Sequence, residues 1–225
     1  MKVLSFAEAL RDENLNVAAG AVVSKCEQLG LTSSMLTIHN ALLARCCQLY
    51  CSDSENVELL EIGTYDGVNA RLLVELFAEL SVTTYDVNPL DPRLQAHNPK
   101  SAEIDVLKQL YSKRVSNTSH PRIRYLEKSS STIFLADMNS KYRIIWVDGD
   151  HSSPQVCFDI MTALYSLAKD KPAHILCDDV YLSPGNATYN CLLSLEKDLN
   201  LDISFYQKRG SGDKYVAEIT LNAIA

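Results

Sequence analysis

Short apolar runs alternate with longer amphipathic segments through most of this chain. Five such runs lie at residues 57–63, 82–88, 122–128, 142–148 and 173–179. The segments that follow them, such as GVNARLLVELFAEL and PQVCFDIMTALYSLAKD, place apolar residues at helical spacing. Regular alternation of buried strands with helices favours a parallel, doubly wound sheet that has helices on both faces. The sequence therefore predicts the α/β fold class.

Both ends of the chain depart from this alternation. DISFYQKR and KYVAEITLN, joined by GSGD, predict a C-terminal antiparallel hairpin. Residues 1–54 predict a helical extension that packs on the core, with Ser33 or Ser34 capping its last helix. We expect a mostly parallel, seven-stranded sheet in one domain, residues 55–225.

The composition of the chain excludes several classes of function. The chain has 225 residues, is 47% hydrophobic and carries a net charge of −7, so it suits one globular domain without a basic surface. Nucleic acid and membranes are therefore not expected partners, and no apolar run reaches the roughly 20 residues of a membrane span. The N-terminus lacks a secretory signal pattern, and seven cysteines without paired CxxC units indicate reduced thiols in a cytoplasmic protein. CCQLYC has no neighbouring Cys or His in the sequence to complete a zinc site.

The turn after the first run, EIGTYDG, has the form of a cofactor-binding loop. In doubly wound sheets, ligands bind where the carboxyl ends of the strands meet. Gly63 and Gly67 permit a tight turn, and Asp86 lies 25 positions after Glu61, where a ribose-binding carboxylate is expected. Glu61 and Asp66 would repel a pyrophosphate, so their acidity favours a cofactor with a cationic aminoacyl end, such as S-adenosylmethionine. The alternative is an ordinary strand-end turn with a solvated acid.

Four acids lie at or just after the ends of the fourth and fifth runs: Asp148, Asp150, Asp178 and Asp179. Neighbouring parallel strands lie about 5 Å apart, so these carboxylates should converge and require neutralisation. Oxygen ligands favour Mg²⁺ or Ca²⁺. The alternative is neutralisation by a nearby lysine or by capping hydrogen bonds. His151 lies beside the cluster and is the candidate proton acceptor.

These motifs together resemble a known family. ELLEIGTYDGVNARLL, TYDVN, IIWVDGDHSSPQVCFDI and ILCDDV are similar to the class I S-adenosylmethionine-dependent methyltransferases. The resemblance is greatest to the metal-dependent O-methyltransferases, which include catechol, caffeoyl-CoA and macrolide-sugar O-methyltransferases, and DGDHS resembles their sugar-modifying and uncharacterised bacterial branch. It covers residues 55–220 and implies a Rossmann-like methyltransferase fold.

The resemblance also implies site residues. Asn69 would help to hold the methionine carboxylate, Asp86 the ribose, and Ser129 and Ser130 would flank the adenine. The implied cofactor residues are Glu61, Gly63, Tyr65, Gly67, Asn69, Asp86, Ser129, Ser130 and Asp148. The implied metal ligands are Asp148, Asp178 and Asp179, holding Mg²⁺ (or Ca²⁺ or Mn²⁺), and His151 is the implied base. Asp150 is expected to support the ligands.

The resemblance implies methylation of a hydroxyl on a small molecule with adjacent oxygens, catechol-like or a sugar diol. A homodimer is possible. Two features depart from the family pattern: EKSSS lacks the usual Gly-Asp, and residues 88–104 form a long segment that could be a lid or a dimer contact. Alternatives are a metal-dependent hydroxylase of the same fold, for which no 2-His-1-carboxylate set is evident, and a non-catalytic cofactor-binding protein.

Overall fold

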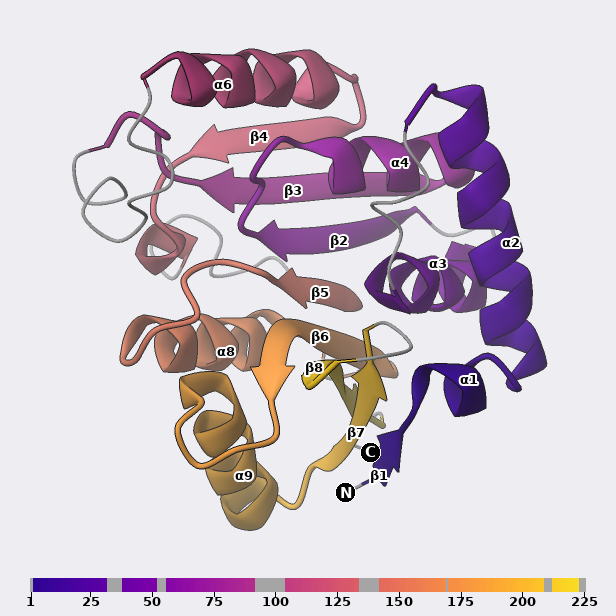
Figure 1. Cartoon of the computed structure of the whole chain (residues 1–225), viewed down its shortest axis with the longest axis vertical. Coiled ribbons are helices and arrows are strands. Elements are labelled where there is room, and N and C mark those ends of the chain that lie inside the picture. The colour runs from indigo at the N-terminus through magenta and orange to yellow at the C-terminus, as the bar shows by residue number, and fades with distance from the viewer. Residues whose placement is uncertain are drawn as a thin grey trace.

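The computed structural model places an eight-stranded sheet at the centre of the molecule (Figure 1). It describes residues 2–31, 38–51, 56–91, 104–133, 142–168, 170–208 and 212–222. The strands are β1 (Lys2–Leu4), β2 (Val57–Ile62), β3 (Leu80–Asp86), β4 (Ile123–Glu127), β5 (Ile144–Val147), β6 (Ala173–Tyr181), β7 (Asp202–Gln207) and β8 (Lys214–Leu221). The helices are α1 (Phe6–Ala9), α2 (Glu13–Gln28), α3 (Ile38–Cys51), α4 (Val68–Leu76), α6 (Ile104–Thr118), α8 (Gln155–Ser166) and α9 (Ala187–Leu199).

The strand order is β1-β7-β8-β6-β5-β2-β3-β4. All neighbouring strands pair in parallel except at β8, which is antiparallel to both β6 and β7. The chain runs outward from β2 to β4 and then returns to build the other half from β5, so the order reverses between β2 and β5. Their carboxyl ends share one edge of the sheet (left in Figure 1), where ligands bind in folds of this type. The predicted fold class and hairpin are confirmed.

Two apolar layers enclose the sheet. Along β5, Ile144 and Trp146 face the layer that contains α3 and α4, whereas Ile145 and Val147 face the layer that contains α8 and α9. This alternation follows from the two-residue period of a strand, and all four side chains are at most 3% exposed. Trp146 is 1% exposed and stacks on His39 with 5.1 Å between ring centroids, so it is a core residue.

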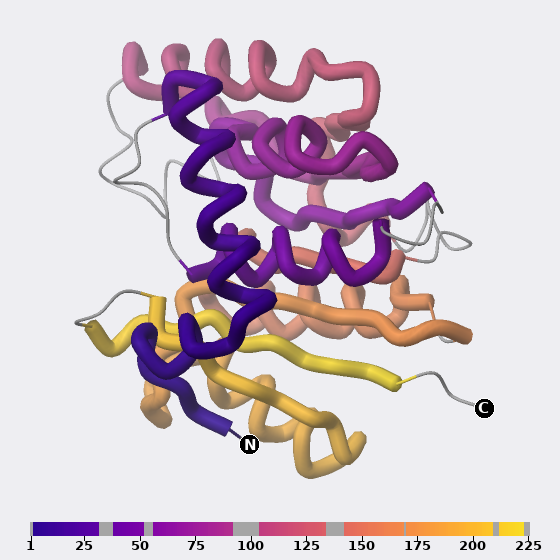
Figure 2. Tube along the Cα trace, turned by 90° about the vertical axis from the view of Figure 1, so that its right-hand side faces the viewer, coloured from indigo at the N-terminus to yellow at the C-terminus, as the bar shows by residue number. Residues whose placement is uncertain are grey.

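The N-terminal residues differ from the predicted all-helical extension. Lys2–Leu4 forms β1, which pairs in parallel with β7 and adds an eighth strand to the seven expected. Helix α2 lies outside the two layers and packs on α3 and α4 (Figure 2). Ser33 and Ser34 lie outside the described residues, as does most of the 88–104 segment. The division at residue 54 stays a prediction.

The segment 129–140 is described only as far as Ile133. It begins with a short 3₁₀ helix, η3 (Ser130–Thr132), capped by Ser129. Among the helices of the described ranges, none has the length and apolar character needed to cross a membrane.

Candidate functional site

The loop between β2 and α4 is built around two glycines with positive φ. Gly63, at φ 100°, brings the chain so near to the end of β5 that a Cβ would lie 2.1 Å from the carbonyl oxygen of Asp148. Gly67, at φ 75°, precedes the first turn of α4 and lies against Thr118 and Asn117. The amide of Asp148 donates a hydrogen bond to the carbonyl of Ile62 at 2.8 Å, so the carboxyl ends of β2 and β5 are joined directly.

Glu61 connects the start of this loop to α4 and β3 through hydrogen bonds. Its side chain is buried, and its two oxygens accept hydrogen bonds from Asn69 (2.8 Å) and Thr84 (2.6 Å). Asn69 in turn accepts a hydrogen bond from Asn40 of α3 at 3.3 Å. Burial raises the pKa of Glu61 to about 7, helped by repulsion from Asp148 and Asp86 and opposed by the two hydrogen bonds. A cationic ligand bound beside the loop would therefore favour the charged form of Glu61.

Glu61→Gln is expected to remove part of the pH dependence of stability. Because the pKa of Glu61 is raised on folding, its contribution is full below about pH 4.5 and is lost as the pH rises through about 7. Between pH 5 and pH 8 the wild type should lose on the order of 1–3 kcal/mol more unfolding free energy than Glu61→Gln. Urea unfolding at both pH values measures this. Glu58→Gln, on the exposed side of β2, is the control, and equal losses in wild type and Glu61→Gln would contradict the prediction.

Asp86, the predicted ribose acid, ends β3 beside the same loop. Its oxygens accept hydrogen bonds from the amides of Tyr65 and Val87, both at 2.8 Å. The guanidinium of Arg114, 2% exposed, lies 2.8 Å from Asp86 and also donates to the carbonyls of Tyr65 and Val87. Burial raises the pKa of Asp86, and Arg114 opposes that rise. Tyr65, at φ 50°, is 63% exposed beside these groups.

The two predicted adenine serines differ in their contacts. The hydroxyl of Ser129 caps η3 and lies 2.9 Å from that of Ser131. Ser130 donates to the carboxylate of Asp159, a buried residue of α8, at 2.6 Å, and Gln155 donates to both. The Ser130 hydroxyl is thus oriented by a helix that lies elsewhere in the sequence.

Asp148 and His151 lie together at the carboxyl end of β5. The Nε2 of His151 is 3.5 Å from Oδ1 of Asp148. Burial raises the pKa of Asp148, and repulsion from Asp178 adds to this. Burial lowers the pKa of His151, but Asp148, Asp179 and Asp178 outweigh it and raise the pKa above its ordinary value. Asp150 accepts a hydrogen bond from the amide of Ser152 at 2.8 Å and is exposed, so it shapes the turn.

Asp178 and Asp179 meet two lysines from the C-terminal hairpin. A bulge in β6 between Cys177 and Val180 interrupts the alternation of side chains, and Asp179 has φ 49°. Both acids consequently reach Nζ of Lys208, at 2.7 Å and 2.8 Å, and Lys214 lies 2.7 Å from Asp179. Burial raises the pKa of Asp179, but the hydrogen bonds of the two lysines outweigh it and hold the value at about 2.

These contacts do not fit a divalent ion on the three predicted acids. Within the described ranges, one set of three His, Cys, Asp or Glu side chains has ligand atoms that all lie within 4.8 Å of one another, and it is Cys46, His174 and Glu218. Both oxygens of Asp179 and one oxygen of Asp178 bond lysines instead. Of the alternatives weighed from the sequence, the lysine neutralisation matches the geometry.

The buried set of Cys46, His174 and Glu218 also has a cationic partner, Arg45. His174 and Glu218 are distant from Cys46 in the sequence, so the motif CCQLYC alone does not reveal them. The guanidinium of Arg45 lies 2.5 Å from Oε1 of Glu218, and Tyr206 donates to Oε2 at 2.8 Å. Burial raises the pKa of the Cys46 thiol, which opposes the thiolate that a metal needs. We interpret the set as a neutralised core network between α3, β6 and β8.

The reversed strand order, the glycine turn and the acid at the end of β3 are typical of a site for a nucleotide-type cofactor. Residues 60–180 match the methyltransferase domain family, and the chain belongs to this family. The predicted enzyme class is thereby confirmed. No curated protein sequence is similar enough to count as a match.

Solved structures share the fold at low identity. The O-methyltransferase TomG from Streptomyces achromogenes, involved in tomaymycin synthesis and in complex with SAM, has a TM-score of 0.55 at 14% identity, with 95% of this chain and 91% of that chain covered. An O-methyltransferase from Bacillus cereus in complex with SAH has 0.53 at 13%, covering 93% and 91%. The N-methyltransferase NodS from Bradyrhizobium japonicum has 0.50 at 13%, covering 83% and 97%. Because both O- and N-methyltransferases have this fold, the fold does not select the acceptor atom.

The sequence analysis assigns no role to four residues of the site: Asn40, Arg114, Asp159 and Lys208. Asp159 carries one visible signal, since an acid shares the apolar face of α8 with Val156, Ile160 and Ala163. Arg114 follows the polar residues Ser112 and Lys113, and Lys208 directly follows β7. Neither position is distinguished by its spacing from that of a solvated basic residue.

Proposed function

We propose that this protein transfers a methyl group from S-adenosylmethionine to a hydroxyl of a small molecule that has adjacent oxygens, catechol-like or a sugar diol. One observation carries the proposal: an Asp148–His151 pair stands at the end of β5, in direct backbone contact with the glycine loop of β2. A proton acceptor is thus held next to the place where this fold binds its cofactor.

Four side chains would hold the cofactor. Asp86, held by Arg114 and the loop amides, would accept hydrogen bonds from the ribose hydroxyls. The acidity of Glu61 suits the cationic aminoacyl end, and Asn69 would approach the methionine carboxylate from α4. Ser130, oriented by Asp159, lies in the segment after β4 that would flank the adenine. The SAM and SAH in the complexes of similar fold support this choice of cofactor.

In the proposed reaction, the hydroxyl oxygen of the acceptor attacks the sulfonium methyl carbon. The O–H proton moves to His151, a C–O bond forms, and the S–C bond breaks with its electron pair passing to sulfur. Holding the two reactants in line supplies most of the acceleration, and His151, whose charged form Asp148 stabilises, supplies proton transfer. The predicted divalent ion stays a prediction that the lysine pairs disfavour, and no step uses it. A hydroxylase or a non-catalytic binding protein would lack this methyl transfer.

His151→Gln is expected to lower kcat for methyl transfer by at least about 100-fold, because the acceptor loses its general base. The affinity for S-adenosylhomocysteine should stay within about twofold, since His151 is assigned no cofactor contact. Transfer of labelled methyl to a panel of catechols and sugar diols gives kcat, and calorimetry gives the affinity.

His120→Gln, in the turn before β4, is the control and should change neither quantity. If the wild type does not bind S-adenosylhomocysteine, the methyltransferase proposal fails. If His151→Gln retains full kcat, His151 is not the base.

A further inference from the structure

Lys208 lies within the acidic cluster at the carboxyl ends of β5 and β6. It follows β7, which is parallel to β6, so it reaches the same carboxyl edge of the sheet as Asp178 and Asp179. Its side chain is 15% exposed and donates to one oxygen of each acid. Within the described part of the chain, its third N–H has no partner.

Asp178 depends on this lysine. Oδ2 is 2.7 Å from Nζ of Lys208, whereas Oδ1 is buried and has no hydrogen-bond partner among the described residues. Without Lys208, Asp178 would be a buried charge with no compensating group, which is strongly unfavourable. Asp179 has a second partner, since Lys214 bonds its other oxygen from the exposed side.

The charges of the cluster nearly balance while His151 is a neutral base, and they balance fully once it has taken a proton. Three carboxylates, Asp148, Asp178 and Asp179, face the ammonium groups of Lys208 and Lys214 and the imidazole of His151. A divalent ion placed among them would leave an excess of positive charge unless it expelled a lysine. The lysines thus supply the neutralisation that the metal supplies in the family resembled by the sequence.

We propose that Lys208 is the resident cation of this site, and that the protein binds its acceptor without a divalent metal ion. The role of Lys208 in methyl transfer rests on the proposed function, whereas the metal-binding test below does not depend on it. During transfer the acceptor oxygen gives its proton to His151 and carries developing negative charge until the C–O bond forms. The fixed ammonium of Lys208 stabilises that charge, and its remaining N–H is available to an acceptor oxygen.

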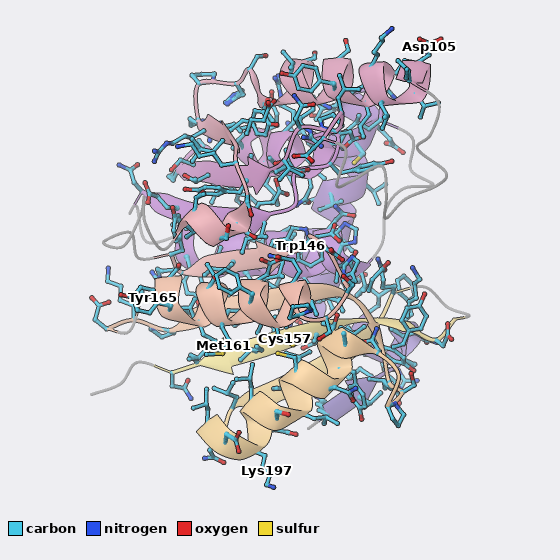
Figure 3. The ribbon with its side chains drawn as sticks, turned by 90° about the vertical axis from the view of Figure 1, so that its left-hand side faces the viewer. Asp105, Trp146, Cys157, Met161, Tyr165 and Lys197 are labelled. Atoms are coloured by element: carbon cyan, nitrogen blue, oxygen red, sulfur yellow. The ribbon has the colours of Figure 1, made fainter. Side chains whose placement is uncertain are left out.

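The test is calorimetric titration of Mg²⁺ and of Mn²⁺, each alone, into the full chain. The wild type should show no binding with a Kd below about 1 mM. Lys208→Met should bind Mn²⁺ at least about tenfold more tightly than the wild type, because three acids then lack their central cation. Lys197→Met, the same change on α9, is the matched control for net charge and should behave as the wild type (Figure 3).

Two results would overturn the proposal: binding of either ion by the wild type below about 1 mM, or no gain of affinity in Lys208→Met. If Lys208→Met does not fold alone, its unfolding temperature in Mn²⁺ serves instead, and rescue by the ion is the expected result. Failure of Mn²⁺ to rescue it would count against the proposal. S-adenosylhomocysteine titrated into the same wild-type sample tests the proposed function separately, since its binding requires no metal.

Discussion

Gly63→Ala is expected to lower the unfolding free energy by at least about 3 kcal/mol and to abolish cofactor binding. The added Cβ would lie 2.1 Å from the carbonyl oxygen of Asp148 and 2.5 Å from its carbon. Both atoms belong to backbone, so no side chain can move aside. The ends of β2 and β5 would have to separate, and the hydrogen bond from Asp148 to Ile62 would lengthen or break. Urea unfolding and calorimetry with S-adenosylhomocysteine measure the two effects.

The Gly30→Ala variant separates the cost of a left-handed backbone from the cost of a steric clash. Gly30 has φ +67°, and a Cβ there would meet nothing within 4 Å. Its replacement should cost only the roughly 1–2 kcal/mol of a left-handed residue and leave cofactor affinity unchanged. If Gly63→Ala behaved like Gly30→Ala, the contact between the two strand ends would not be what maintains the cofactor site.

The architecture could be predicted because its signals are local. Most of the parallel strands are short apolar runs that end at a glycine or a polar residue, as in IIWVD, and the crossovers between them have helical spacing. β1 gives no such signal, because three residues are too few to show a two-residue period. Its partner β7 lies about two hundred residues away in the sequence, and the edge that β7 leaves open decides its conformation.

The acids of the site could be predicted more readily than the bases that pair with them. Asp86 ends β3, Asp148 follows β5, and Asp178 lies near the carboxyl end of β6, so topology alone brings them to one edge. Lys208 reaches Asp178 and Asp179 only because a bulge in β6 turns both acids the same way. Arg114 lies on α6, and its direction depends on how that helix packs against α4. A bulge and a helix rotation depend on tertiary packing. For this reason the sequence leaves a neutralising lysine open only as an alternative beside a divalent cation and capping hydrogen bonds.

Arg114→Met is expected to cost about 3–5 kcal/mol of unfolding free energy, the range for removing one partner of a buried ion pair. Arg114 is 2% exposed, and it bonds Asp86 as well as the carbonyls of Tyr65 and Val87. Its loss would leave Asp86 without the cation that opposes the burial-induced rise of its pKa. Arg114→Lys keeps the charge but loses the planar fork, so it should recover only part of the stability.

Arg71→Met is the matched control, because Arg71 pairs with Glu75 one turn along α4 at a partly exposed position. It should cost less than about 1 kcal/mol. The affinity of the Arg114 variants for S-adenosylhomocysteine then decides what Asp86 does. If Asp86 binds the ribose, affinity should fall with Arg114→Met and return in part with Arg114→Lys, because the carboxylate must be charged and held in place to accept both hydroxyls. If affinity stayed at the wild-type value while stability fell, Arg114 and Asp86 would together only fix the glycine loop to β3, and the ribose contact would have to come from elsewhere in the loop.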